Sequence, residues 1–259
     1  MRNSFVSTSW QEESEDHVRE VRICRVVSLG LVSYASAWEM QRWLVEQRKA
    51  GQIEDTLLLL EHTPVITLGR NASKEHVLSS PEVLANEGIE VVEANRGGDV
   101  TFHGPGQLVG YPILDLSRIR KDVVWYVRTL EEALIRTAAE FGLAAGRKKG
   151  MTGVWVGEAK VAAIGVHISR WVTCHGFALN LETDLEFFRH IVPCGIGNYP
   201  VTCFRQLLGR PVDRAEVEPR VVHHMGELLG LLMEQGAPES LPESLKDSVQ
   251  RRPSCLPTY

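Results

Sequence analysis

The 259-residue sequence lacks the features that mark several large classes of protein. It has only five cysteines, and no two of them stand in a C-x-x-C spacing: Cys24, Cys174, Cys194, Cys203 and Cys255. This pattern argues against a disulfide framework and against a metal site built from cysteines, and it predicts free thiols in a reducing compartment. The longest apolar runs have the length of strands, so the sequence predicts no association with a membrane.

The sequence also lacks the cluster of basic residues that is typical of nucleic-acid-binding proteins. The formal net charge is −5, both signs are spread along the chain, and no stripe of Lys and Arg stands out. Nucleic acid is therefore not an expected partner. The first 20 residues contain the acidic run Glu12-Glu13-Ser14-Glu15-Asp16, the opposite of a signal or transit peptide. The sequence predicts a cytoplasmic protein.

Apolar segments are spread evenly from about Val21 to about Met233, which predicts a single folded domain over residues 21–235. Residues 1–20 are acidic and aperiodic, and residues 236–259 are rich in Pro, Ser and Glu. Both compositions are typical of disordered extensions.

Within the folded part, strand-like segments outnumber helical ones. Alternating or uniformly apolar runs predict strands at 21–28, 56–60, 65–68, 89–92, 108–114, 153–157, 160–168 and 176–181. Three- and four-residue spacing and capping residues predict helices at 34–49, 81–86, 123–141, 185–191 and 214–233. Because several strands adjoin through turns, we expect an α/β (α+β) fold with a mixed, mostly antiparallel sheet and helices packed on it.

The stretch from Arg96 to Gln107 is the most constrained in the chain, with four glycines and a proline in twelve residues. Glycines let backbone N–H groups approach a ligand, the Arg96 guanidinium can bind an anion, and His103 adds an imidazole. A tight surface turn would need neither of these side chains. The pattern therefore predicts a loop between two strands that forms one wall of a site.

Cys194 lies between Pro193 and Gly195, so its backbone is constrained and its sulfur is expected to reach solvent. Lys160 opens an apolar strand at the point where burial begins. An ammonium beside a thiol favours the thiolate, so a Cys/Lys pair could carry out acyl transfer.

Four other residues are weaker candidates for the site. Cys174 and Cys203 lie near the expected site loops and remain rival thiols. His167 and His175 are more typical of structural than of catalytic histidines.

Four motifs in this order are specific when they occur together. They are Arg96-Gly97-Gly98-x-x-Thr101-x-His103-Gly104-Pro105-Gly106-Gln107, Ala159-Lys160-Val161-Ala162-Ala163-Ile164-Gly165, His175-Gly176-Phe177-Ala178-Leu179-Asn180 and Pro193-Cys194-Gly195-Ile196. Over roughly residues 21 to 232 they resemble the octanoyl-[acyl-carrier-protein]:protein octanoyltransferase family of lipoate biosynthesis. The resemblance implies the fold of the biotin and lipoate protein ligases.

The resemblance also implies a ping-pong reaction that uses no ATP and no cofactor. Octanoyl-acyl carrier protein is the implied donor, and a lysine on the lipoyl domains of 2-oxoacid dehydrogenases or on the glycine cleavage H protein is the implied acceptor. By the same resemblance, Cys194 takes the acyl group and Lys160 lowers the pKa of that thiol and assists proton transfer. The implied substrate-binding residues are Arg96, Gly97, Gly98, Asp99, Val100, Thr101, Phe102, His103, Ala163, Ile164, Gly165, Gly176, Phe177 and Ala178. Phe102 departs from the family pattern, in which a tyrosine is common at this position.

Two other functions compete with this interpretation. An ATP-dependent lipoate or biotin protein ligase on the same fold would have a similar glycine loop but no use for Cys194. An inactive scaffold that binds acyl carrier or lipoyl domains would have no use for an activated thiol.

Overall fold

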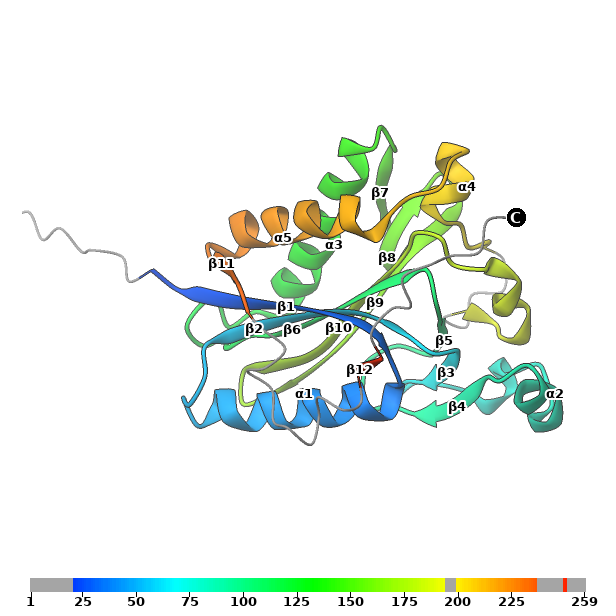
Figure 1. The fold of residues 1–259 in the computed structure, drawn as a ribbon, viewed down its shortest axis with the longest axis horizontal. Coiled ribbons are helices and arrows are strands. Elements are labelled where there is room, and N and C mark those ends of the chain that lie inside the picture. The colour runs from blue at the N-terminus through cyan, green and yellow to red at the C-terminus, as the bar shows by residue number, and fades with distance from the viewer. Residues whose placement is uncertain (1–20, 194–198, 237–248, 251–259) are drawn as a thin grey trace, which may run out of the picture.

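The computed structural model describes residues 21–193, 199–236 and 249–250. Its centre is a nine-stranded sheet with the order β11-β1-β2-β6-β10-β9-β8-β7, in which β12 also pairs with β1 (Figure 1). The strands are β1 (Ile23–Val32), β2 (Asp55–His62), β6 (Gln107–Ile113), β7 (Ala145–Lys148), β8 (Met151–Val156), β9 (Ala159–Ser169), β10 (Val172–Asn180), β11 (Leu232–Gln235) and β12 (Val249–Gln250). Strand β1 is parallel to β2 and β11, and the remaining pairs are antiparallel. The expected mixed, mostly antiparallel sheet is confirmed.

A second sheet of three strands, β4 (Glu90–Glu93), β3 (Val65–Leu68) and β5 (Val100–His103), lies beside the first. The helices are α1 (Tyr34–Lys49), α2 (Pro81–Asn86), α3 (Val123–Glu140), α4 (Phe204–Leu208) and α5 (Arg214–Leu229), with 3₁₀ turns η1 (Lys74–His76) and η2 (Leu185–His190). None of the helices in the described part of the chain is both long and apolar enough to cross a membrane.

The central strand β2 shows how the sequence builds two cores. Alternate side chains of a strand point to opposite faces. Leu57 and Leu59 pack into the core under α3 and α5, whereas Leu58 and Leu60 pack into the core under α1. Helix α1 therefore covers one face of the sheet and α3 and α5 cover the other, as Figure 1 shows.

Capping residues set the helix starts; the sequence predicts those of α1 and α3 from Ser33 and Asp122, and that of α2 from Pro81. The side chains of Ser33, Ser80 and Asp122 accept hydrogen bonds from backbone N–H groups in the first turns of α1, α2 and α3. The predicted start of the last helix is also confirmed, but its predicted end at Met233 is wrong. Gly230 takes a left-handed conformation with φ 64° and stops α5 at Leu229. Residues Leu232–Gln235 then form β11, parallel to β1.

The prediction that residues 96–107 form one continuous loop is also wrong in part. Val100–His103 is strand β5, which pairs antiparallel with β3. The β-branched and aromatic residues of this segment favour a strand, and the surrounding glycines hid that preference in the sequence. Strand β7 and helix α4 were not predicted, because both are short.

The predicted disordered ends, 1–20 and 236–259, fall mostly outside the described residues. Within the second of them, Val249–Gln250 pair as β12 with Leu31 and Val32 of β1.

Candidate active site

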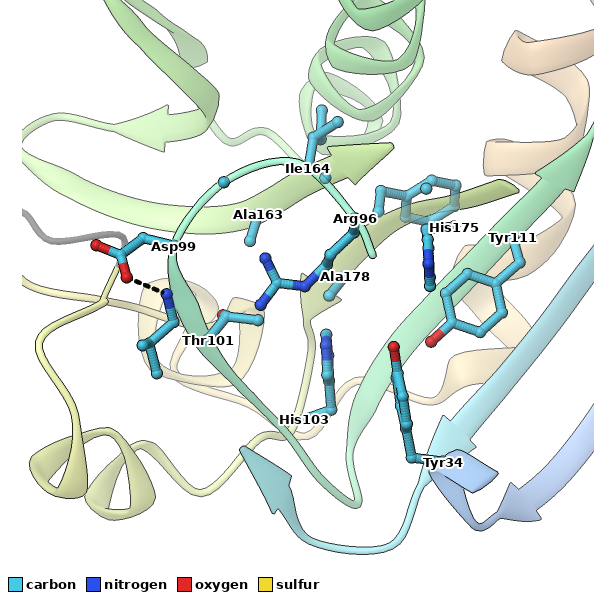
Figure 2. A pocket seen from close by; sticks show the side chains of 15 residues that line it. Tyr34, Arg96, Asp99, Thr101, His103, Tyr111, Ala163, Ile164, His175 and Ala178 are labelled. Atoms are coloured by element: carbon cyan, nitrogen blue, oxygen red, sulfur yellow. Dashed lines mark hydrogen bonds between the residues drawn. The ribbon is translucent and has the colours of Figure 1, made fainter. Parts of the chain in front are cut away.

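A pocket lies where the two sheets and α1 meet, and we call it the Arg96 pocket. Tyr34 comes from the start of α1, Tyr111 from β6, and the rest from the 96–103 segment and from β9 and β10 (Figure 2). Its lining comprises Tyr34, Arg96, Gly98, Asp99, Val100, Thr101, His103, Tyr111, Ala163, Ile164, Gly165, His175, Gly176, Phe177 and Ala178. Figure 2 shows the Arg96 guanidinium lying among Thr101, Ala163 and Ala178. The pocket thus combines small apolar walls with one buried cation, which suits an acyl chain that ends in a polar carbonyl group.

The side chain of Arg96 is held in this position by Thr67 on β3. Its Nη2 donates to the Thr67 carbonyl oxygen at 2.6 Å and to Thr67 Oγ1 at 2.8 Å, and its Nε donates to Oγ1 at 3.2 Å. Arg96 is only 7% exposed. The guanidinium is therefore pre-positioned before any ligand binds.

Glycines make this close packing possible. Gly98 has φ 85°, a left-handed conformation that favours glycine. On the facing strand, a Cβ at Gly165 would stand 2.8 Å from the Gly97 carbonyl oxygen and 3.2 Å from Arg96 Cδ. Without that Cβ, the Gly97 N–H reaches the Val166 carbonyl oxygen at 2.9 Å and ties the 96–98 segment to β9.

His103 belongs to a chain of hydrogen bonds that starts at Arg96. Thr67 Oγ1 accepts from Arg96 and lies 3.4 Å from His103 Nε2, to which its hydroxyl can donate. His103 Nδ1 donates to Gln107 Oε1 at 2.8 Å. Gln107 Nε2 in turn donates to Asn180 Oδ1 at 2.9 Å. This chain, which we call the Gln107 relay, fixes His103 as a neutral imidazole protonated on Nδ1.

Burial keeps the other imidazoles of this region neutral as well. It lowers the pKa of His62 to about 4 and, with the nearby Arg96 charge, that of His175 to about 3. Burial, followed by the influence of His62 and Arg96, holds the pKa of His103 well below its usual range. Burial raises the pKa of Tyr34 to about 12. At neutral pH these side chains shape the pocket and form hydrogen bonds, and Arg96 supplies a positive charge.

His175 lines the Arg96 pocket, although its sequence context is more typical of a structural histidine. Its backbone has φ 58°, a strained conformation for a residue with a Cβ. Its ring stacks on Trp38 at 4.8 Å and its Nε2 lies 2.6 Å from Asn95 Oδ1. His167, by contrast, does not line this pocket.

Lys160 lies in a second, adjoining pocket, which we call the Lys160 pocket. Thr101, Ala163 and Ala178 line both pockets, so the two share a wall. The other lining residues are Gln107, Lys160, Ala162, Asn180, Phe188, Pro193 and Val201. Lys160 is 7% exposed, and its Nζ lies 4.8 Å from the ring centroid of Trp155. The Gln107 relay starts at Arg96 and ends at Asn180 in the Lys160 pocket, so hydrogen bonds link the residues of the two pockets.

Cys194, with Gly195, falls outside the described residues, but both flanks of that segment are placed. Pro193, directly before it, lines the Lys160 pocket. After it, the Lys160 N–H donates to the Pro200 carbonyl oxygen and the Thr202 N–H donates to the Lys160 carbonyl oxygen, both at 2.9 Å. One flank of the segment that contains Cys194 is therefore bonded to the Lys160 backbone, and the other lines the Lys160 pocket.

The thiols that the structure describes are poorly suited to act as nucleophiles. Cys24, Cys174 and Cys203 are free and buried. Burial raises the pKa of each of them, that of Cys174 to about 12. A thiol with a raised pKa has little thiolate at neutral pH.

Two residues expected to bind substrate do not line the Arg96 pocket in the described structure. Phe102 points into the small-sheet core, where its ring stacks on Phe187 at 4.9 Å. Gly97 lies behind the pocket and bonds to β9. The alternation of side chains along β5 explains the direction of Phe102, because Thr101 and His103 face the pocket and the residue between them must face away.

The sequence reasoning missed several residues that build the two pockets: Tyr34, Thr67, Gln107, Tyr111 and Asn180. Gln107 and Asn180 end two of the four motifs and could have been noticed there. Tyr34, Thr67 and Tyr111 stand in ordinary strand and helix patterns that carry no signal of a site.

Comparison with known proteins now identifies the class. The family model of the lipoyl protein ligase A/B catalytic domain matches residues 33–226. A bipartite lipoate protein ligase from Thermoplasma acidophilum, described together with its E2 lipoyl domain, has a similar fold with a TM-score of 0.68. It is 17% identical, and the match covers 87% of this chain and 91% of that one. The chain belongs to the lipoyl protein ligase A/B catalytic domain family.

More similar relatives are octanoyltransferases. The octanoyltransferase of Koribacter versatilis is 49% identical over 242 residues, which is 88% of this chain and 96% of that protein. The octanoyltransferase of Solibacter usitatus is 52% identical over 217 residues, 84% of this chain and 98% of that protein. Within its family the chain therefore groups with the octanoyltransferases, which are acyltransferases.

Proposed function

We propose that this enzyme transfers an octanoyl group from octanoyl-acyl carrier protein to a lysine of a lipoyl domain, through a thioester on Cys194. The observation that carries the proposal is the pair of adjoining pockets. One has small apolar walls around the fixed Arg96, and the other is lined by Lys160 and by Pro193, directly before Cys194. The octanoyltransferase names of relatives that are about half identical support the same reaction.

In the first step, the Cys194 thiolate attacks the thioester carbonyl carbon of the donor. A new C–S bond forms at Cys194, the bond to the carrier thiol breaks, and the leaving thiolate takes a proton from the Lys160 ammonium. Lys160 is then a neutral amine, and the carrier protein departs with a free thiol.

In the second step, the ε-amine of the lipoyl-domain lysine attacks the acyl-enzyme. A C–N bond forms, the C–S bond to Cys194 breaks, and the amine proton passes to Lys160. The thiolate and the ammonium are restored. Because an amide is more stable than a thioester, the sequence of steps needs no nucleotide.

Arg96 and the neutral side chains of its pocket have a binding role in this proposal. The aliphatic chain contacts Ala163, Ile164, Gly165 and Phe177, which lie on β9 and β10. The proposed substrate-binding residues are those that the family resemblance implies, except Phe102 and Gly97, which do not line the pocket.

The proposal is tested by intact-mass spectrometry of the full chain. Mixed with octanoyl-acyl carrier protein and without ATP, the enzyme should gain one octanoyl group and lose it on addition of a lipoyl domain. Cys194→Ala should gain none, whereas a variant with Cys24, Cys174, Cys203 and Cys255 replaced by Ala should still gain one. If octanoyl transfer to the lipoyl domain requires ATP and free octanoate, the enzyme is instead an ATP-dependent ligase.

A further inference from the structure

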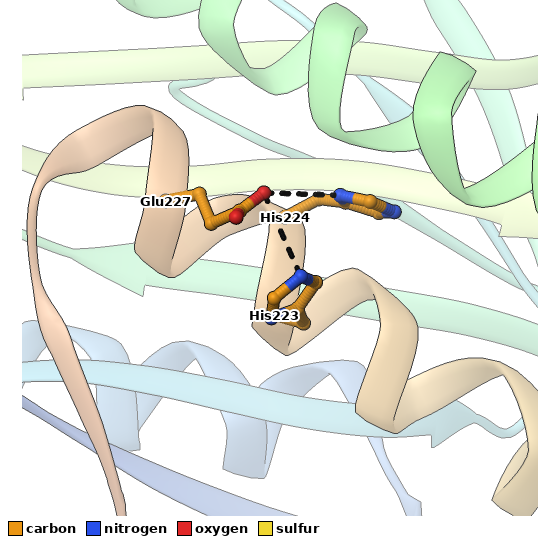
Figure 3. Close-up of side chains that lie close together, drawn as sticks. All are labelled: His223, His224 and Glu227. Carbon is orange, nitrogen blue, oxygen red and sulfur yellow. Dashed lines mark ion pairs between the residues drawn. The ribbon is translucent and has the colours of Figure 1, made fainter.

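A cluster of two histidines and a glutamate on α5 lies outside the site described above. His223, His224 and Glu227 each offer one nitrogen or oxygen atom, and these atoms all lie within 4.8 Å of one another. Figure 3 shows both imidazole rings directed toward the Glu227 carboxylate. The cluster lines neither the Arg96 pocket nor the Lys160 pocket.

The orientation of His224 is fixed by a second carboxylate. Its Nε2 lies 2.5 Å from Glu140 Oε1, at the end of α3, so this nitrogen is the one that donates. The other nitrogen, Nδ1, is buried, finds no hydrogen-bond partner among the described residues, and lies 3.7 Å from Glu227 Oε2. In the neutral ring, a lone pair on Nδ1 therefore faces the carboxylate oxygen. A cation between them would satisfy both acceptors.

The spacing suits a metal ion. Glu227 Oε2 is 3.6 Å from His223 Nε2 and 3.7 Å from His224 Nδ1. Tetrahedral Zn²⁺ with bonds of roughly 2.1 Å holds its ligands about 3.4 Å apart. The side chain of His223 is 62% exposed, so it can turn to close the remaining gap.

We propose that His223, His224 and Glu227 bind a divalent transition-metal ion, with Zn²⁺ the best-suited ion, and leave a fourth position open to water. Glu140 positions His224 by accepting its Nε2–H, as carboxylates commonly do behind metal-binding histidines. The charge of Glu140 is balanced separately, because its Oε2 lies 2.9 Å from Arg220 Nε. The bound ion therefore meets the negative charge of Glu227.

Equilibrium dialysis of the full-length protein against Zn²⁺ tests this site. The cysteines can also bind zinc, so the quantity to measure is the difference in bound ions between wild type and the double variant His223→Ala/Glu227→Gln. We expect the double variant to bind one ion fewer. The control Glu216→Gln removes an exposed carboxylate from the first turn of the same helix and should bind as wild type does.

A second measurement isolates the role of Glu140. Glu140→Gln should weaken Zn²⁺ binding at this site by about 10- to 100-fold. Added Zn²⁺ should also raise the melting temperature of wild type more than that of the double variant. Equal numbers of ions on wild type and double variant, or unchanged affinity in Glu140→Gln, would overturn the assignment and leave a set of surface ion pairs.

Discussion

The Arg96 pocket and the Lys160 pocket share a wall, yet they are built in different ways. In the first, Arg96 and His103 are tied by hydrogen bonds within two sheets before any ligand is present. In the second, Lys160 stands at the start of β9 beside Trp155, and its backbone is bonded to Pro200 and Thr202, which follow the Cys194 segment. The comparison indicates that the Arg96 pocket is fixed by side-chain hydrogen bonds between strands, whereas the described part of the Lys160 pocket is held by backbone hydrogen bonds to the 200–202 segment.

Removing the cation of the Lys160 pocket should have the largest effect. We expect Lys160→Ala to slow octanoyl transfer by roughly 100- to 10,000-fold, since it removes a general acid and base. It should also raise the pH at which Cys194 reacts with iodoacetamide, because the thiolate loses a nearby positive charge.

Two matched variants sharpen this result. Lys160→Arg keeps the charge but does not release a proton readily, so it should keep the alkylation profile near that of wild type and still slow turnover. Lys149→Ala removes an exposed lysine and should change neither. Normal turnover in Lys160→Ala would contradict the division of roles between the two pockets.

At the binding end, Arg96→Ala should raise the KM for the octanoyl donor more than it lowers kcat. It should also lower the free energy of unfolding by about 1–3 kcal/mol, because the Thr67 carbonyl and hydroxyl oxygens lose their buried donor. This cost exceeds what a loop residue would show. Steady-state kinetics and urea unfolding measure the two effects, and unchanged donor use would assign Arg96 a purely structural role.

The Gln107 relay offers a way to disturb both pockets at once. Gln107→Leu leaves His103 Nδ1 and Asn180 Oδ1 without their partner, so we expect a loss of about 1–3 kcal/mol in stability. We also expect acyl-enzyme formation to slow, since Asn180 holds the Thr202 carbonyl oxygen beside Lys160. Gln52→Leu, at an exposed glutamine, is the control. Single-turnover rates equal to wild type would show that the two pockets work independently.

The most gradual expected effect is a loss of stability as the pH falls. Burial depresses the folded-state pKa of His62 to about 4 and that of His175 to about 3. Below the ordinary histidine pKa of about 6.5, the unfolded chain therefore binds more protons than the folded chain. The stability that these two neutral imidazoles contribute is therefore fully present above about pH 6.5 and falls as the pH drops below it, by up to about 1.4 kcal/mol per pH unit for each histidine. Urea unfolding between pH 7.5 and pH 4.5 measures this loss. A flat profile would show that these imidazoles are not held neutral.

Much of the fold was predictable because its signals are local. The caps Ser33 and Asp122 and the uniformly apolar run of β2 depend on neighbours in the chain, and each agrees with the structure. Strand β5 was missed because the glycines around it hid its strand preference. The end of α5 was missed because the helix-like pattern of apolar residues continues past Gly230.

The sequence by itself determined which residues are the candidates for the site, since Lys160, Arg96 and the glycine-rich motifs carry the resemblance to the octanoyltransferases. Only the tertiary structure decided which residues meet them. Thr67, Gln107 and Asn180 lie on different strands, far apart in the chain, and the register of the two sheets brings them onto one hydrogen-bonded path. Tertiary structure also turned Phe102 away from the pocket and His175 toward it. The physical reason is that a strand residue's side depends on its pairing register, which long-range contacts set and local sequence does not.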